Sequence, residues 1–272
     1  MNGNPNEVRK AVSQRYSTAV ADPQTSGCCG NKLFSYSEQE IASLPAAAVE
    51  SSFGCGNPVA FAGVKEGDVV VDLGSGSGID VLLAAKAVGP RGRVVGIDMN
   101  DEMIAKANEN VRRANVQNAE IRKGIIESLP VADASVDWIV SNCVVNLSPE
   151  RSRVFREIAR VLKPGGQMLI SDIVTGPIDE KKLGLAAKYA LRISQASEIA
   201  FVEGLRAAGL TQIEVRERLV YDAGQIELVF KGLPAEDGAM QEMLLPLARQ
   251  AVGSVWHAMF YARRPVYSPV AC

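Results

Sequence analysis

The stretch VVVDLGSGSG, residues 69–78, decides the fold. Residues 69–75 form a short apolar run with several β-branched side chains, which is typical of a parallel strand buried on both faces. Glycine recurs at positions 74, 76 and 78, and glycine lets a chain turn tightly and bring its backbone close to a ligand. A helical pattern over residues 78–89 follows at once. The stretch therefore predicts a buried strand, a ligand-binding turn and a helix in direct succession.

The same alternation continues along the chain. Further strands are predicted at 93–100, within 119–130, at 135–146 and at 165–174, and helices are predicted at 101–113 and 148–162. Strands and helices that alternate in this way form a parallel sheet with helices on both faces. The predicted fold class is thus α/β, a doubly wound and mostly parallel Rossmann-like sheet.

The flanking regions have different patterns. Before the core we expect a helix at 7–20, a helix near 38–46 that begins with a Ser37–Glu40 capping box, and a loop around Cys55. After residue 176 we expect helices at 181–194 and 197–210, a strand at 211–222, and one or two helices within 237–263. The predicted division is an N-terminal segment with a substrate loop (1–60), a cofactor-binding core (61–176), and the rest of the core with a smaller α+β C-terminal lobe covering the substrate (177–272).

Composition excludes several classes of protein. The 272 residues include 29 Lys and Arg against 31 Asp and Glu, so there is no basic excess that would indicate nucleic-acid binding. No apolar run is long enough to span a membrane, and the first ten residues are polar, so we expect a cytoplasmic protein. We also expect a monomer. The cysteines are odd in number, and none form a C-x-x-C pair, which argues against a disulfide framework and a structural zinc site; they are Cys28, Cys29, Cys55, Cys143 and Cys272.

Two motifs resemble those of class I S-adenosylmethionine-dependent methyltransferases. One is the run DLGSGSG at 72–78, and the other is LKPGG at 162–166, just before the fifth predicted strand. A dinucleotide-binding Gly-x-Gly-x-x-Gly pattern that starts at Gly74 would need a glycine where Ile79 stands. An NAD-binding domain and an ordinary strand–helix turn remain the alternatives.

The resemblance implies a set of residues that bind S-adenosylmethionine. Gly74 and Gly76 would approach the amino-acid half of the cofactor, with Asp72 near its amine. Asp98, at the end of the second strand, would bind the ribose, where carboxyl ends of parallel strands place ligands. Met99 would lie against the adenine, and Ile126 and Glu127 would frame its other edge. The set also includes Asn142, at the end of the fourth strand.

Two further motifs indicate one family among these methyltransferases. FGCGNP at 53–58 and SNCVVNL at 141–147 are similar to motifs of the arsenite S-adenosylmethionine methyltransferase family, over roughly residues 7–210. The family implies methylation of a trivalent arsenical, arsenite or methylarsenite, in arsenic detoxification or arsenical biosynthesis. Cys55 and Cys143 would hold the arsenic as thiolates, which are soft ligands suited to a thiophilic centre. Arsenic attacks through a lone pair and needs no catalytic base, so we expect the single histidine, His257, to pack or cap in a C-terminal helix.

The chain departs from the family pattern in one place. A further cysteine that typical members carry is absent from ALRISQAS, residues 190–197. We therefore expect a preference for methylarsenite, or for arsenite that brings a small thiol as its third ligand. Glutathione or thioredoxin would serve as the thiol reductant and partner. Cys28 or Cys29 would relay a disulfide during turnover and reduce or receive arsenic from Cys55, as a further arsenic ligand, or the pair lies in a flexible surface loop. Cys272 is incidental.

Two other functions remain compatible with these residues. A methyltransferase that acts on a carbon or oxygen of another small molecule would use the same cofactor but would not need the thiols. A non-catalytic protein that sequesters a metalloid would use the thiols but would produce no S-adenosylhomocysteine.

Overall fold

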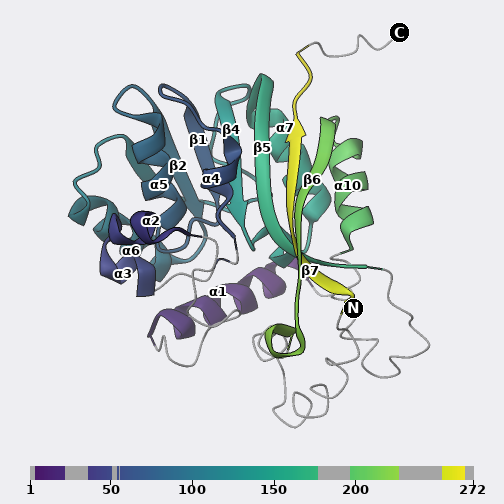
Figure 1. Cartoon of the computed structure of the whole chain (residues 1–272), viewed down its shortest axis with the longest axis horizontal. Coiled ribbons are helices and arrows are strands. Elements are labelled where there is room, and N and C mark those ends of the chain that lie inside the picture. Colours follow the sequence, from purple (N-terminus) through teal and green to yellow (C-terminus); the bar gives the residue numbers. More distant parts are fainter. Residues whose placement is uncertain are drawn as a thin grey trace.

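A seven-stranded mixed sheet forms the centre of the protein, and it is flanked by helices (Figure 1). The computed structural model describes residues 4–21, 36–50, 54, 56–176, 197–226 and 253–266. The strands lie in the order β3 (Ala119–Lys123), β2 (Arg93–Asp98), β1 (Val69–Leu73), β4 (Val136–Asn142), β5 (Leu162–Thr175), β7 (Val255–Arg263) and β6 (Thr211–Val220). The predicted strands from 69 to 174 are confirmed, as is the strand predicted at 211–222.

The chain reverses its direction of travel across the sheet between β1 and β4. Strands β1 to β3 step outward to one edge, and β4 then returns to pair with β1 on its other side. All neighbouring pairs from β3 to β5 are parallel, so their carboxyl ends lie at one end of the sheet. In open α/β sheets, the crevice at such a reversal point is where ligands bind.

Each face of the sheet has its own hydrophobic core, because successive strand residues point to opposite faces. On β1, Val71 and Leu73 pack with residues of α7 (Arg151–Val161) and α10 (Glu198–Ala207). Val70 lies on the other face and packs with residues of α4 (Pro58–Ala62) and α5 (Ile79–Val88). The two apolar layers confirm the doubly wound α/β class.

The remaining helices lie toward the amino-terminal part of the chain. Among the described residues they are α1 (Pro5–Ala21), α2 (Glu38–Ala42), α3 (Ala46–Glu50) and α6 (Asp101–Arg113), and a short 3₁₀ turn, η1, spans Val145–Leu147. The predicted capping box is present: the Ser37 hydroxyl accepts from the Glu40 amide, and the Glu40 carboxylate accepts from the Ser37 amide. The helices predicted at 7–20, 101–113 and 197–210 are confirmed with small changes of boundary.

The prediction of a helix through residues 255–263 is wrong, because these residues form β7. The strand lies antiparallel between β5 and β6 and pairs with β5 over nine residues, from Thr175↔Val255 to Gln167↔Arg263. Both of its faces are buried over most of its length, so its sequence is a continuous apolar run. Such a run does not distinguish a buried strand from a buried helix. The predicted helix at 181–194 and residues 237–252 of the last one lie outside the described residues.

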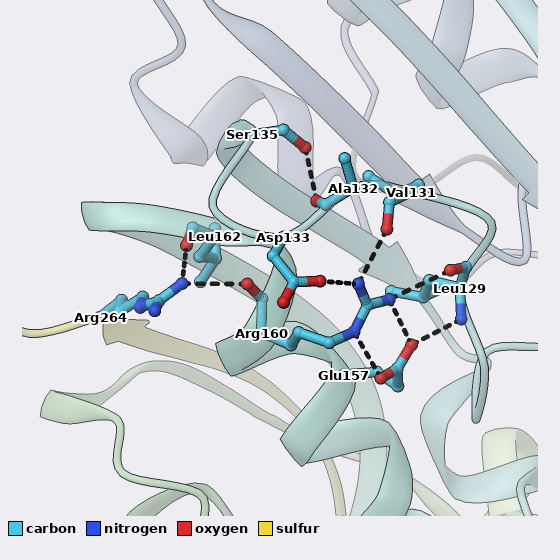
Figure 2. Close-up of polar contacts among 9 residues, drawn as sticks. All are labelled: Leu129, Val131, Ala132, Asp133, Ser135, Glu157, Arg160, Leu162 and Arg264. Atoms are coloured by element: carbon cyan, nitrogen blue, oxygen red, sulfur yellow. Dashed lines mark hydrogen bonds and ion pairs between the residues drawn. The ribbon is translucent and has the colours of Figure 1, made fainter.

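An arginine cluster joins three elements at the end of the sheet opposite the carboxyl ends of the parallel strands (Figure 2). Arg160, near the end of α7, donates to the carbonyl oxygens of Leu129 (3.1 Å) and Val131 (2.9 Å) and pairs with Glu157 (2.7 Å). Arg264, which follows β7, donates to the Arg160 carbonyl oxygen at 2.9 Å. The cluster fixes the loop before β4, the last turn of α7 and the end of β7 to one another.

Candidate active site

A cavity opens at the carboxyl ends of β1, β2 and β4. Its space, including the mouth, is about 1000 Å³, which is enough for a ligand of nucleoside size or larger. The eight residues that the sequence predicted for the cofactor all line this one cavity: Asp72, Gly74, Gly76, Asp98, Met99, Ile126, Glu127 and Asn142. The structure therefore brings together a set of side chains that is spread over 71 positions of the chain, from 72 to 142.

The glycine turn forms one wall of the cavity. Gly74 and Gly76 have positive φ angles of 69° and 51°, which a residue with a side chain rarely adopts. A Cβ atom on Gly74 would lie within 3.0 Å of the Val144 side chain, so the turn has no room for one. At Gly76 no atom lies within 4 Å of the Cβ position. Gly76 thus presents bare backbone to open space in the cavity.

Three carboxyl groups line the cavity near this turn. Asp98 accepts hydrogen bonds from the amides of Gly76 and Asn100, each at 2.9 Å. Burial raises the pKa of Asp80 to about 6, and burial together with the charges of Asp80 and Asp98 raises the pKa of Asp72 well above its usual range. None of the ion pairs among the described residues involves these three groups. This end of the cavity therefore favours a ligand with positive charge.

Asn142, the last residue of β4, connects the cavity to the segment around residue 55. Its amide oxygen accepts from the Gly56 amide at 3.0 Å, and its amide nitrogen donates to the Gly56 carbonyl oxygen at 2.6 Å. The same nitrogen lies 3.1 Å from the Tyr36 hydroxyl and 3.2 Å from Asp80. A Cβ atom on Gly54 would lie less than 3.0 Å from the Asn142 side chain. Asn142 thus holds the backbone beside Cys55 and also lines the cavity.

Cys143 follows directly and has an unusual backbone conformation. Its φ is +60°, in the left-handed region that residues with a side chain adopt at a cost, and its amide donates to the Ser171 carbonyl oxygen at 2.8 Å. Its side chain is half-buried. Cys55, Cys28, Cys29 and Cys272 lie outside the described residues, as do residues 190–196 of the segment that lacks the further cysteine. The convergence of Cys55 and Cys143 stays a prediction.

The turn after Cys143 is fastened to the end of β5. The buried carboxylate of Asp172 accepts from the amides of Asn146 (3.0 Å) and Ile173 (2.8 Å). The Asn146 side chain donates to the Ile173 carbonyl oxygen and accepts from Arg151, each at 2.8 Å. Burial raises the pKa of Asp172 to about 6, although both amide hydrogen bonds oppose the rise.

His257 lies on β7 and not on a helix, which corrects the element predicted for it. Its prediction as a packed residue is confirmed, because the side chain is 1% exposed. Its Nε2 atom is hydrogen-bonded to the Ser171 hydroxyl, and burial lowers its pKa to about 4. A neutral imidazole therefore lies beneath the Gly54–Gly56 segment: a Cβ atom on Gly56 would be 2.8 Å from this nitrogen.

Sequence reasoning missed the contribution of α1 to the cavity. Arg9, Val12, Ser13 and Tyr16 of this helix line the cavity wall. Arg9 pairs with Glu127 at 3.2 Å and with Glu150. The spacing of Val12 and Tyr16 is typical of any amphipathic helix, so no signal in the sequence distinguished this wall from ordinary core packing.

Further hydrogen bonds attach α1 to the core and hold the Glu127 carboxylate in place. The Asn100 side chain donates to the Ser13 carbonyl oxygen at 3.0 Å and to the Ser17 hydroxyl at 2.8 Å. Glu127 also accepts from the Ser148 hydroxyl at 2.6 Å. Arg9 and the Ser148 hydroxyl thus bind the same Glu127 oxygen, Oε1, and hold the carboxylate in the cavity wall.

Two features are absent from the described ranges, which run from residue 4 to 266 with gaps. No helix there combines the length and the apolar character that crossing a bilayer requires. No group of three or more His, Cys, Asp and Glu side chains there is arranged to hold a metal ion.

The glycine turn, the carboxyl group at the end of β2 and the reversal between β1 and β4 together define a nucleotide-type site on a doubly wound sheet. Residues 64–205, more than half of the chain, match the family model described as "Methyltransferase domain". The chain belongs to this family of methyltransferase domains.

Within that family, the chain is similar to proteins named arsenite methyltransferase. It is 44% identical over 196 residues to one from Halobacterium salinarum, covering 65% of this chain and 50% of that protein. It is 39% identical over 161 residues to one from Aquipseudomonas alcaligenes, covering 56% and 46%. The chain thus spans about half the length of the curated relatives it matches.

A solved structure of an arsenic methyltransferase is similar to this chain over more of its length. The crystal structure of an arsenic(III) S-adenosylmethionine methyltransferase from Chlamydomonas reinhardtii superimposes with a TM-score of 0.59 at 25% identity, covering 95% of this chain and 75% of that one.

Proposed function

We propose that this chain transfers a methyl group from S-adenosylmethionine to a trivalent arsenical held by the thiolates of Cys55 and Cys143. One observation carries the proposal. Asn142 hydrogen-bonds both backbone polar groups of Gly56, so the residue before Cys143 and the residue after Cys55 are in direct contact. The similarity to proteins named arsenite methyltransferase supports the choice of substrate.

The cavity fits S-adenosylmethionine by its chemistry. The cofactor carries a sulfonium and an ammonium, and the carboxyl groups of Asp72 and Asp80 would balance this charge. Asp98 would accept from the ribose hydroxyls, and Met99 and Ile126 would contact the adenine. The Ser75 hydroxyl is buried and has no hydrogen-bond partner among the described residues.

The proposed reaction makes few demands on the protein. S-adenosylmethionine supplies an electrophilic methyl group: the arsenic lone pair forms the new As–C bond as the S–C bond breaks and S-adenosylhomocysteine leaves. No proton is removed from arsenic, so no general base is needed. The residues act by placing the lone pair in line with the methyl group, which is a matter of proximity and orientation. The neutral, buried His257 agrees with this assignment, because it lies outside the cavity lining.

Several finer features belong to the same proposal. The chain would prefer methylarsenite, or arsenite carrying a small thiol, since ALRISQAS provides no third cysteine. Glutathione or thioredoxin would regenerate the thiols, and Cys28 or Cys29 would relay a disulfide or receive arsenic from Cys55. We propose a cytoplasmic monomer that binds no nucleic acid or membrane, with an N-terminal segment to residue 60, a cofactor core to 176 and a substrate-covering remainder.

The test is to incubate the protein with S-adenosylmethionine, glutathione and either arsenite or methylarsenite, and to identify methylated arsenicals by chromatography coupled to mass spectrometry. We expect methylated product and a faster reaction with methylarsenite. Cys143→Ser and Cys55→Ser should each abolish methylation while the affinity for S-adenosylmethionine stays within about twofold of the wild type. Cys272→Ser is the matched control and should behave as the wild type.

Other outcomes would assign the chain differently. Binding of arsenicals without formation of S-adenosylhomocysteine would make it a metalloid-sequestering protein. Methylation of another small molecule that persists in both cysteine variants would make it a methyltransferase of carbon or oxygen.

A further inference from the structure

We infer that two adjacent residues at the end of β5, Ser171 and Asp172, position the two segments that carry the proposed arsenic-binding thiols. This inference rests on the proposed function and adds positioning residues to it. Neither residue lines the cofactor cavity, so neither is expected to contact the cofactor.

Adjacent residues of a strand point to opposite faces of the sheet, and here each face carries one of the two segments. Leu169, two positions before Ser171, packs in the core beneath α4, the helix that follows Gly56. Ile170, two positions before Asp172, packs in the other core, together with Val145 of the turn after Cys143. A single strand end thus reaches both segments.

Ser171 acts on the Gly54–Gly56 side. Its hydroxyl is hydrogen-bonded to Nε2 of the buried His257 and lies 3.4 Å from the Asn142 amide oxygen, the atom that accepts from the Gly56 amide. A Cβ atom on Gly56 would meet the Ser171 hydroxyl and His257 at less than 3.0 Å. The three polar side chains form a floor on which the Gly56 backbone rests, and glycine is the residue that allows this close approach.

Asp172 acts on the Cys143 side. Its two carboxylate oxygens accept from two different amides, those of Asn146 and Ile173, and so join the turn after Cys143 to β5. The Cys143 amide is bonded to the Ser171 carbonyl oxygen, so the turn is held at both ends. These bonds fix the left-handed conformation of Cys143, which an unrestrained cysteine would leave.

The contacts suggest two variants, one for each of the two segments. In Asp172→Asn, one of the two acceptor oxygens becomes a donor that faces an amide N–H, so the turn or the strand loses one buried hydrogen bond. In Ser171→Ala, the floor under Gly56 loses its central hydroxyl. The matched controls are Asp133→Asn and Ser135→Ala, which make the same chemical changes at the opposite end of the sheet.

The experiment measures two constants for each variant: the Kd for S-adenosylmethionine by calorimetry and the KM for methylarsenite in the methylation assay. We expect each variant to raise the KM for methylarsenite about tenfold, the effect of losing one buried hydrogen bond, with the cofactor Kd within about twofold of the wild type. The controls should change neither constant. An unchanged KM in both variants, or an equal loss of affinity for both ligands, would overturn the inference.

A third readout separates this inference from the proposed function. The rate at which iodoacetamide alkylates Cys143, followed by peptide mass spectrometry, should change severalfold in Asp172→Asn and not in Asp133→Asn. If the wild type methylates no arsenical, the proposed function fails, but the alkylation rates still decide whether Asp172 positions the cysteine. If Asp172→Asn fails to fold, Asn146→Ala loosens the same turn while leaving the buried carboxylate in place.

Discussion

Substitution of Gly56 by alanine tests the packing of the segment beside Cys55. The added methyl group would lie less than 3.0 Å from the Ser171 hydroxyl and 2.8 Å from Nε2 of His257. A Cβ atom essentially never comes this close to a non-bonded heavy atom, so the Gly56 backbone or the Ser171 and His257 side chains must shift. Overpacking of this kind costs about 1–3 kcal/mol. The movement also strains the two hydrogen bonds to Asn142, each worth about 1 kcal/mol.

We therefore expect Gly56→Ala to lower the free energy of unfolding by about 1–3 kcal/mol, or the midpoint of thermal unfolding by roughly 2–10 °C. The KM for the arsenical should rise by about tenfold or more, while the Kd for S-adenosylmethionine changes little. Gly224→Ala is the control, because its Cβ atom would meet its nearest neighbour, Asp222, at an ordinary 3.4 Å. If Gly56→Ala unfolds and methylates like the wild type, the segment does not rest on this floor and the reasoning fails.

Three further predictions concern the cavity and the far end of the sheet. Arg9→Gln removes the ion pairs to Glu127 and Glu150 and should raise the cofactor Kd about tenfold in calorimetry, and no change would show that α1 is held by its other contacts. Because a cationic cofactor favours ionised Asp80, whose pKa burial raises to about 6, the cofactor affinity should fall by up to about tenfold per pH unit as the pH drops below 6; a calorimetric pH series should show this slope in the wild type and a flattened one in Asp80→Asn. Arg160→Ala should lower the free energy of unfolding by about 2–3 kcal/mol in urea without altering the cofactor Kd, and a weaker cofactor affinity would contradict the placement of this cluster away from the site.

Local sequence patterns were sufficient to predict most of the sheet. Strands β1 to β5 and the helices between them each carry their own periodicity, and the glycine turn marks where the first strand meets the ligand cavity. β7 was predicted wrongly because both of its faces are buried: Phe260 packs in the core with α7 and α10, and Met259 packs in the core on the other face with α4 and α5. A strand of this kind has no alternation of apolar and polar residues, so only the pairing itself identifies it.

The candidate site also has a part that local sequence predicted and a part that it did not. The cofactor residues follow the ends of successive strands, a rule of the fold, and could therefore be located from the sequence. The bonds from Asn142 to Gly56 join residues 86 positions apart, and the Arg9–Glu127 pair joins residues 118 apart. No local pattern encodes such pairs. The binding of arsenic by Cys55 and Cys143 stays a prediction, because Cys55 lies outside the described ranges.

The position of β7 in the sheet has a consequence for synthesis. The strand emerges from the ribosome after β6, yet it must enter between β5 and β6, and it brings His257 beneath the Gly56 backbone. Until then β5 offers the nascent chain an open edge of unsatisfied peptide groups, the kind of edge that pairs with other chains. Translation past residue 263 is therefore needed before this sheet can close, and a ribosome stalled earlier would hold a folding intermediate prone to aggregation.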